Sequence, residues 1–187
     1  IQVLSPTRKG PAGTRALNQA IQAAVNPPAP DKAERSFGSV VFREGDRVMQ
    51  TKNDYDLLWE SDDDVGMGVF NGDIGTIADI DFQEETLTVQ FDDRTAEYAF
   101  DMLSELEPAY AMTVHKSQGS EYRAVILTAW NGSPYLLSRS ILYTAITRAR
   151  ELLIIVGREE TVGVMVENAR KNRRYSGLKL RLQGKVK

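Results

Sequence analysis

The middle of the chain, from Val40 to Glu107, consists of short runs in which apolar and polar residues alternate. Alternation with a period of two indicates half-buried strands. Turn residues such as Asn71-Gly72 and Asp92-Asp93 separate these runs. Because no space is left for helices, we predict a small β-barrel over 39–107, in which the acidic tract 54–64 is a solvated loop. The predicted strands are 46–51, 65–70, 74–80, 86–91 and 96–100.

The segments on either side have the pattern of an α/β domain. A strand at 1–4 precedes a helix that Thr14 is expected to cap and that ends at the proline cluster 26–30. After Pro108, apolar runs predict buried strands, and residues at helical spacing predict two helices. We therefore predict one parallel-sheet domain, formed by 1–38 and 108–187 and interrupted by the barrel. Its later strands are 109–114, 122–129 and 152–156, and its later helices are 136–149 and a segment beginning at Thr161.

Composition excludes several classes of protein. Hydrophobic residues make up 42% and charged residues 26% of the 187 positions, which is typical of a globular protein, and no apolar run approaches the length of a membrane span. We expect a cytoplasmic location and no membrane partner. Cysteine is absent and His115 is the only histidine, so we expect no metal site supplied by this chain alone.

Charge is distributed unevenly around the net value of −3. Residues 54–64 contain six acids, whereas residues 170–187 contain eight Lys or Arg and no acid. The basic tail is suited either to neutralising nucleic acid phosphates or to docking a neighbouring domain.

The segment 113–121 gathers groups that bind phosphates and sugars. Thr113 and His115 can hydrogen-bond a phosphate oxygen, Gly119 lets the backbone approach a ligand, and the Glu121 carboxylate suits ribose hydroxyls. The alternative is a structural turn between strands, in which His115 and Gln118 satisfy backbone groups.

Arg148 also has two interpretations from the sequence alone. It lies seven residues after Ile141, close to the buried face of the predicted helix. A cation there stabilises the carboxyl end of a helix by about 0.3–1 kcal/mol. An arginine finger on a transferring phosphoryl group would instead contribute ~10³–10⁵ in rate.

Three segments resemble helicase motifs, in the order that the family has them. Residues 3–10 (VLSPTRKG) resemble motif IV of superfamily 1 DNA helicases, 111–122 (AMTVHKSQGSEY) resemble motif V, and 142–150 (LYTAITRAR) resemble motif VI. A small barrel between the first two is similar to the RecD-like branch, which translocates 5′ to 3′. Residues 42–49, 53–55 and 71–72 resemble that branch too.

The resemblance implies a RecA-like motor domain with an SH3-like barrel, in a helicase of DNA repair and recombination. It assigns Arg148 to the γ-phosphate and Arg8 to a supporting catalytic role. Gln118, Gly119 and Glu121 would border the nucleotide, whereas Thr113, His115, Lys116 and Ser117 would bind single-stranded DNA. The implied ligands are ATP with Mg²⁺, and the implied partners are single strands, single/double-strand junctions and nuclease-complex subunits.

The other half of such a site has no counterpart in the sequence. It contains neither a G-x-x-x-x-G-K-[ST] loop nor an Asp-Glu pair for magnesium and water. We expect a fragment that needs a first motor domain and hydrolyses no ATP alone; the opening of the chain within a strand at Ile1 suggests the same. The alternatives are a non-catalytic nucleic-acid or protein-binding module, and the helicase part of a relaxase-helicase.

Overall fold

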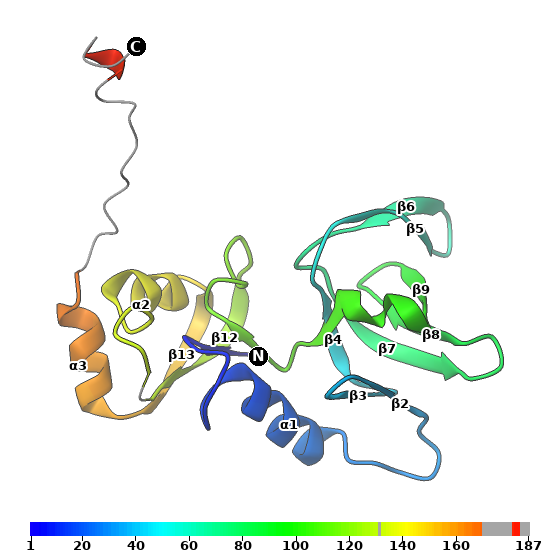
Figure 1. Ribbon diagram of the computed structural model, residues 1–187, viewed down its shortest axis with the longest axis horizontal. Helices are drawn as coiled ribbons and strands as arrows, with labels where there is room; N and C mark the ends of the chain where they lie inside the picture. The colour runs from blue at the N-terminus through cyan, green and yellow to red at the C-terminus, as the bar shows by residue number, and fades with distance from the viewer. Residues whose placement is uncertain (131, 170–180, 184–187) are drawn as a thin grey trace.

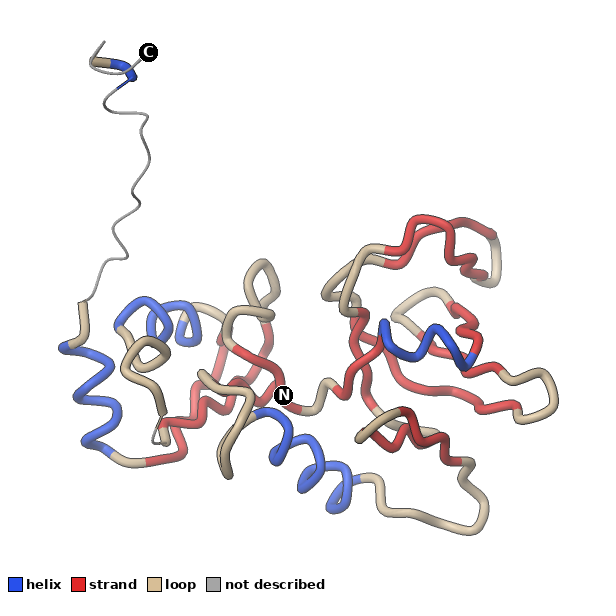
Figure 2. Tube along the Cα trace, viewed as in Figure 1, coloured by secondary structure: helices blue, strands red, loops and turns tan. Residues whose placement is uncertain are grey.

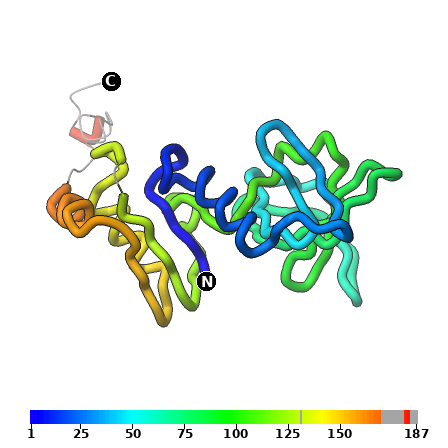
Figure 3. The backbone as a smooth tube through the Cα atoms, turned by 90° about the horizontal axis from the view of Figure 1, so that it is seen from below, coloured from blue at the N-terminus to red at the C-terminus, as the bar shows by residue number. Residues whose placement is uncertain are grey.

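The computed structural model describes residues 1–130, 132–169 and 181–183. A parallel sheet and a larger antiparallel sheet contain most of its strands, and two further strands, β2 (Glu34–Phe37) and β3 (Val40–Arg43), pair with each other in a small antiparallel sheet. The two larger sheets form separate lobes, joined where α1 (Thr14–Val25) and β4 (Arg47–Gln50) lie (Figures 1 and 3). The predicted class, an α/β domain interrupted by a small barrel, is confirmed.

The parallel sheet has the order β11-β1-β12-β13, and every neighbouring pair in it is parallel. Leu4, Val125 and Leu127 are fully buried on its two central strands. These apolar side chains explain why β1 and β12 occupy the middle of the sheet. The strands are β1 (Gln2–Ser5), β11 (Ala111–Thr113), β12 (Tyr122–Ala129) and β13 (Ala149–Gly157).

Helices α2 (Arg139–Ile146) and α3 (Glu159–Glu167) pack against each other beside this sheet (Figure 1). Met165 is fully buried there, whereas Leu152, Ile154 and Val156 of β13 are largely exposed. A parallel strand is normally covered on both faces. Strand β13 therefore presents an uncovered apolar surface.

Helix α1 lies beside β11, the outer strand on the side of the sheet opposite β13. Asn18 pairs with Ala111 as a neighbouring strand would: its Nδ2 donates to the Ala111 carbonyl and its Oδ1 accepts from the Ala111 N–H, both at 2.8 Å. The helix was predicted correctly, but its N-cap is Gly13 and Thr14 is its first residue. Within the described part of the chain, no helix is long and apolar enough to cross a membrane.

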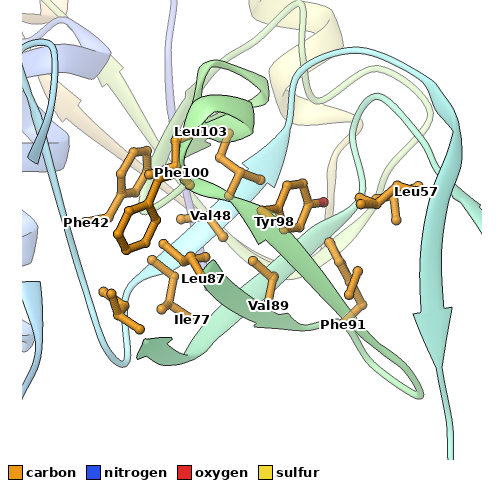
Figure 4. Close-up of a cluster of buried hydrophobic side chains, with 14 residues drawn as sticks. Phe42, Val48, Leu57, Ile77, Leu87, Val89, Phe91, Tyr98, Phe100 and Leu103 are labelled. Carbon is orange, nitrogen blue, oxygen red and sulfur yellow. The ribbon is translucent and has the colours of Figure 1, made fainter. Parts of the chain in front are cut away.

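The antiparallel sheet has the strand order β10-β4-β7-β8-β9-β5-β6 and curls around its own core (Figure 2). Figure 4 shows Phe42, Val48, Leu87, Tyr98 and Leu103 converging in this core. The 3₁₀ helix η1 (Phe100–Glu105) closes one end. The remaining elements are β5 (Asp54–Glu60), β6 (Val65–Val69), β7 (Ile74–Asp81), β8 (Thr86–Gln90), β9 (Thr95–Ala99) and β10 (Leu106–Pro108).

Several local predictions were wrong. The first part of the acidic tract is strand β5, because its acids point outward while Leu57 is buried. Asn71-Gly72 is typical of a hairpin turn, but here it joins β6 and β7, which do not pair with each other. Helix α2 is shorter than 136–149, because Ala149 already pairs with Tyr122 in the sheet. Strands β2, β3 and β10 were not predicted.

Strand β4 belongs to both lobes. Val48 lies in the barrel core, and the next residue, Met49, lies in the core of the parallel sheet. Successive side chains of a strand point to opposite faces, so one strand can serve two cores. The predicted division into 1–38 with 108–187 and 39–107 remains a proposal, with β4 as a shared wall.

A buried carboxylate, Asp46, ties the lobes together just before β4. Its oxygens accept hydrogen bonds from Asn26 Nδ2 at 2.8 Å, the Arg43 N–H at 2.9 Å and the Tyr110 hydroxyl at 3.0 Å. The amide of Gln22 on α1 also donates to it. Burial, together with the charge of Asp46, raises the pKa of Tyr110 to about 12. The phenol therefore remains a hydrogen-bond donor throughout the neutral pH range.

A second buried polar chain crosses the barrel core. The Tyr98 hydroxyl donates to Gln50 Oε1 at 3.0 Å, and Gln50 Nε2 donates to Glu105 Oε2 at 2.9 Å. The Lys52 ammonium lies 2.9 Å from the other Glu105 oxygen. Burial raises the pKa of Tyr98. The network fixes η1 against β4 and β9.

Replacing Tyr98 with Phe should lower the free energy of unfolding by about 1–3 kcal/mol, because it leaves the buried Gln50 acceptor without its donor. Urea denaturation followed by circular dichroism measures the change. Tyr55→Phe, which alters an exposed ring, is the control and should cost less than about 0.5 kcal/mol. Equal losses in the two variants would contradict a structural role for the network.

Candidate functional site

The residues identified from the sequence lie at the two opposite ends of the strands of the parallel sheet, which are called here its carboxyl edge and its amino edge. Since all four strands run in the same direction, the loops after β1 and β11 emerge at the carboxyl edge. Arg8 and Lys116 belong to these loops, and Thr113 is the last residue of β11. Glu121 and Arg148, by contrast, immediately precede β12 and β13 and lie at the amino edge.

At the carboxyl edge, two cations share one carboxylate. Glu107 Oε1 lies 2.8 Å from Lys116 Nζ, and Glu107 Oε2 lies 3.3 Å from Arg8 Nη2. Glu107 is on β10, the strand by which the chain leaves the barrel. The Arg8 side chain is 61% exposed, so it can exchange this exposed ion pair for an anionic ligand at little cost.

The loop after β11 is held in shape by hydrogen bonds to backbone carbonyls. The Val114 N–H donates to the Ser5 carbonyl at 3.1 Å, and the fully buried Ser117 donates its hydroxyl to the Val114 carbonyl at 2.8 Å. Thr113 Oγ1 accepts from the Lys116 N–H at 3.3 Å. His115 is exposed. Thr113, His115 and Lys116 therefore line the outer side of the loop, while Ser117 holds its shape.

This loop also runs the length of the sheet, from its carboxyl edge to its amino edge. In the strand register Leu4 pairs with Leu127 and Ser5 pairs with Thr113, so Thr113 is level with Thr128. The loop then returns to Tyr122, which is six residues lower on β12, or about 20 Å at ~3.3 Å per residue. Gly119 has φ +89°, and the space where a Cβ would lie is open. A left-handed glycine thus makes the return possible.

At the amino edge, Arg148 fastens the end of the loop. Its Nη1 donates to the Ser120 carbonyl at 2.8 Å, its Nε donates to the Thr144 carbonyl at 3.3 Å, and its Nη2 donates to Thr147 Oγ1 at 3.2 Å. A guanidinium has five N–H groups. One donor on each terminal nitrogen is left for a further acceptor.

Glu121 lies beside this arginine and is paired with another one. Arg150 Nε donates to Glu121 Oε2 at 2.9 Å, and both side chains are exposed. Gln118 is exposed in the same loop. The exposed carboxylate and amide of these two residues can reach a ligand that approaches from outside the sheet.

The geometry brings some predicted partners together and separates others. Arg8 contacts the Lys116 group through Glu107, and no described contact joins it to Arg148. It borders a hollow of about 240 Å³ shared with α1 and β3. Glu107, the Ser120 carbonyl and Arg150 were missed from the sequence. Only the position of Glu107, just before the motif V match, was a signal; its partner Arg8 is 99 positions away.

The residues present fit one side of a nucleotide site. Arg148 offers donors to phosphate oxygens, and Gln118 and Glu121 offer polar groups for a sugar. In the described part of the chain, no group of three or more His, Cys, Asp or Glu could hold a metal ion.

Comparison with protein families gives two matches along the chain. The SH3 domain of ATP-dependent RecD-like DNA helicases matches residues 17–91. The UvrD-like helicase C-terminal domain matches residues 108–156. The first match begins within α1 and extends to the end of β8, and the second contains the motif V and VI matches.

Among curated proteins, the ATP-dependent RecD2 DNA helicase of Deinococcus radiodurans is 37% identical over 84% of this chain. The RecD subunit of the RecBCD enzyme of Mycolicibacterium smegmatis is 31% identical over 97% of it. The chain spans only 20% and 29% of the lengths of these two relatives.

Among solved structures, the Pif1 helicase from Bacteroides in complex with ADP-AlF3 and single-stranded DNA has a TM-score of 0.53 and 17% identity. That match covers 97% of this chain and 44% of the other. At this identity the likeness establishes the fold alone, a parallel sheet with an inserted barrel.

Arg148→Ala should free the end of the 113–121 loop, because it removes the donor to the Ser120 carbonyl. We expect faster amide hydrogen exchange in residues 117–121 and an unfolding free energy lower by about 1–2 kcal/mol. Mass spectrometry of the exchanged chain measures the first quantity. Arg150→Ala, which breaks only an exposed ion pair, is the matched control and should change stability by less than about 1 kcal/mol. Unchanged exchange in Arg148→Ala would contradict the fastening role.

Proposed function

Since this chain belongs to the RecD-like DNA helicases, we propose that it supplies one wall of the ATP site and part of the single-strand track of an ATP-dependent 5′ to 3′ DNA helicase. One observation supports the proposal most directly. The loop 113–121 carries Lys116 near the carboxyl edge, and its Ser120 carbonyl accepts a hydrogen bond from Arg148 at the amino edge. A single segment therefore touches both predicted ligand sites.

On the nucleotide side, ATP supplies the phosphoryl group whose transfer to water drives movement. Arg148 directs its two remaining donors at the γ-phosphate and stabilises the charge that develops on the transferring group. Thr144, Thr147 and Ser120 hold the guanidinium in place, so little ordering is needed when phosphate arrives. Gln118 and Glu121 bind the sugar side, and Gly119 gives the ligand access to the backbone.

On the strand side, Thr113 and His115 donate to phosphate oxygens, and Lys116 neutralises phosphate charge. Arg8 lies next to Lys116 through their shared Glu107. In this proposal, therefore, Arg8 binds the DNA strand instead of the nucleotide. Glu107 holds both cations at the edge until a phosphate replaces it.

The phosphate loop and the magnesium ligands belong, in this proposal, to another motor domain of a longer protein. The uncovered apolar face of β13 supports a contact with further protein. A role as a subunit in a nuclease complex and binding at single/double-strand junctions are part of the same proposal. The 187-residue chain alone should not hydrolyse ATP.

Lys116→Ala in the 187-residue chain should weaken binding to an oligothymidine and reduce the slope of log K against log salt by about 1, because one phosphate contact is lost. Fluorescence anisotropy at several salt concentrations measures both quantities. Lys9→Ala changes an exposed lysine for which no ion pair is described, and serves as the charge-matched control. A slope that falls equally in both variants would refute a specific site at Lys116.

Arg148→Ala in a longer helicase that contains this segment should reduce DNA-stimulated ATP hydrolysis by ~10³-fold or more while strand affinity stays within a few-fold. A coupled ATPase assay and anisotropy measure the two. Wild-type turnover would refute the arginine finger, and ATP hydrolysis by the 187-residue chain alone would refute the division of the site. No turnover in the longer protein itself would favour a non-catalytic binding module.

A further inference from the structure

A hollow of about 240 Å³ lies between helix α1 and the β2–β3 hairpin, which are neighbours below the junction of the two lobes (Figure 1). One wall is the face of α1 that carries Arg15, Asn18 and Gln22, which recur at helical spacing. The opposite wall is the tip and second strand of the hairpin, with Ser39 and Val40. A typical small-molecule site measures about 300–1,000 Å³, so this hollow suits a single ring system.

The two walls are fixed relative to each other. Gln22 Nε2 on α1 donates to the Val41 carbonyl on β3 at 2.9 Å. The same amide donates to the buried Asp46 carboxylate, which also accepts from the Arg43 N–H of the hairpin at 2.9 Å. The hollow is therefore formed before a ligand arrives, and little conformational freedom is lost on binding.

The hollow continues from the proposed strand site at the carboxyl edge. Arg8 and Glu107, which form an ion pair there, both line it, and the other Glu107 oxygen holds Lys116. The Arg15 N–H donates to the Arg8 carbonyl at 3.3 Å, so the two arginines are neighbours at one end of the hollow. A strand whose phosphates replace Glu107 at Lys116 and Arg8 therefore brings its next nucleotide to this hollow.

The charges of the lining favour a phosphate. Arg15 is exposed, and its guanidinium has no hydrogen-bond or ion-pair partner among the described residues. Of the described residues that line the hollow, Glu107 is the only acid, and both of its oxygens already contact cations. Arginine forms charge-assisted and often bidentate hydrogen bonds with phosphate. Arg15 is thus available to a strand phosphate next to Arg8.

The remaining lining residues suit an uncharged base. Val40 and Pro108 are apolar, whereas Gln19 and Ser39 are exposed and offer polar groups. Proteins bind unpaired bases between apolar side chains and form hydrogen bonds to the polar edge of the base. An amide both donates and accepts, so Gln19 can pair with the edge of any base. The lining therefore complements the phosphate and the base of one nucleotide.

We propose that this hollow binds one nucleotide of single-stranded DNA, with Arg15 on its phosphate, its base between α1 and Val40, and Gln19 on the base edge. The proposal rests on the proposed function and extends the strand track from the motif V loop to the β2–β3 hairpin. Lys116 and Arg8 bind the adjoining phosphates. The hairpin, which was not predicted from the sequence, then has a role in holding the strand.

The test uses the 187-residue chain and oligothymidine, with affinity measured by fluorescence anisotropy over a range of salt concentrations. Arg15→Ala should weaken binding and reduce the slope of log K against log salt by about 1, because one phosphate contact is lost. Arg123→Ala is the charge-matched control, since Arg123 is an exposed arginine at the amino edge whose described ion pair is with Glu151. It should leave the slope unchanged.

Gln19→Ala should weaken binding by about threefold or more with the salt slope unchanged, because an uncharged contact releases no counterions. An oligonucleotide of abasic sites should remove this difference but keep the effect of Arg15→Ala. Gln83→Ala, in the exposed β7–β8 turn, is the matched control and should bind like the unaltered chain. Arg15 and Gln19 are exposed positions of α1, where alanine is a good helix former, and circular dichroism confirms that both variants are folded.

The outcomes separate the two proposals. If Lys116→Ala weakens binding while Arg15→Ala and Gln19→Ala do not, the hollow is refuted and the strand track stands. An equal fall in slope in Arg15→Ala and Arg123→Ala would also refute it, and a Gln19→Ala effect that persists on abasic DNA would refute the base contact. If the unaltered chain binds no single strand, both proposals fail. Thymidine monophosphate that binds as tightly as the oligomer would indicate a site for free nucleotides and overturn the strand assignment.

Discussion

The structure depends on the Asp46 carboxylate, where four donors from separate parts of the chain converge. Gln22 comes from α1, Asn26 from the proline-rich linker, the Arg43 N–H from the end of β3, and Tyr110 from the connection into β11. A buried carboxylate is stable only when such donors compensate for its lost hydration. The lobes therefore need each other at this point, and β4, with Val48 and Met49 in different cores, extends the dependence.

The fold could be predicted where local pattern and tertiary environment agree. Strand β12 alternates around Val125 and Leu127 and is central in its sheet, and the proline cluster after α1 cannot continue a helix. Strand β5 was hidden because Asp54, Asp56 and Glu60 follow its exposed side, and only pairing with β6 and β9 makes it a strand. Helix α2 ends early because β13 begins pairing at Ala149, a long-range fact that helical spacing cannot contain.

The same distinction applies to the candidate site. The motif residues could be identified because they are contiguous, and Lys116 and Arg148 were selected in this way. Their partners are set by tertiary structure: Glu107 is on the barrel's exit strand, and the Ser120 carbonyl is a backbone group without any side-chain signature. The separation of Arg8 from Arg148 depends on strand direction and register. Neither can be read from the spacing of residues in the chain.

The path of the 113–121 loop also has a thermodynamic consequence. Its two ends lie about 20 Å apart along the strands and belong to one short covalent segment that Ser117 and Arg148 hold in shape. If a ligand at one end favours one arrangement of this segment, linkage requires that a ligand at the other end alter the first affinity by the same factor. In the proposed helicase, one coupling free energy then describes both the effect of nucleotide on the affinity for single-stranded DNA and the effect of single-stranded DNA on the affinity for nucleotide.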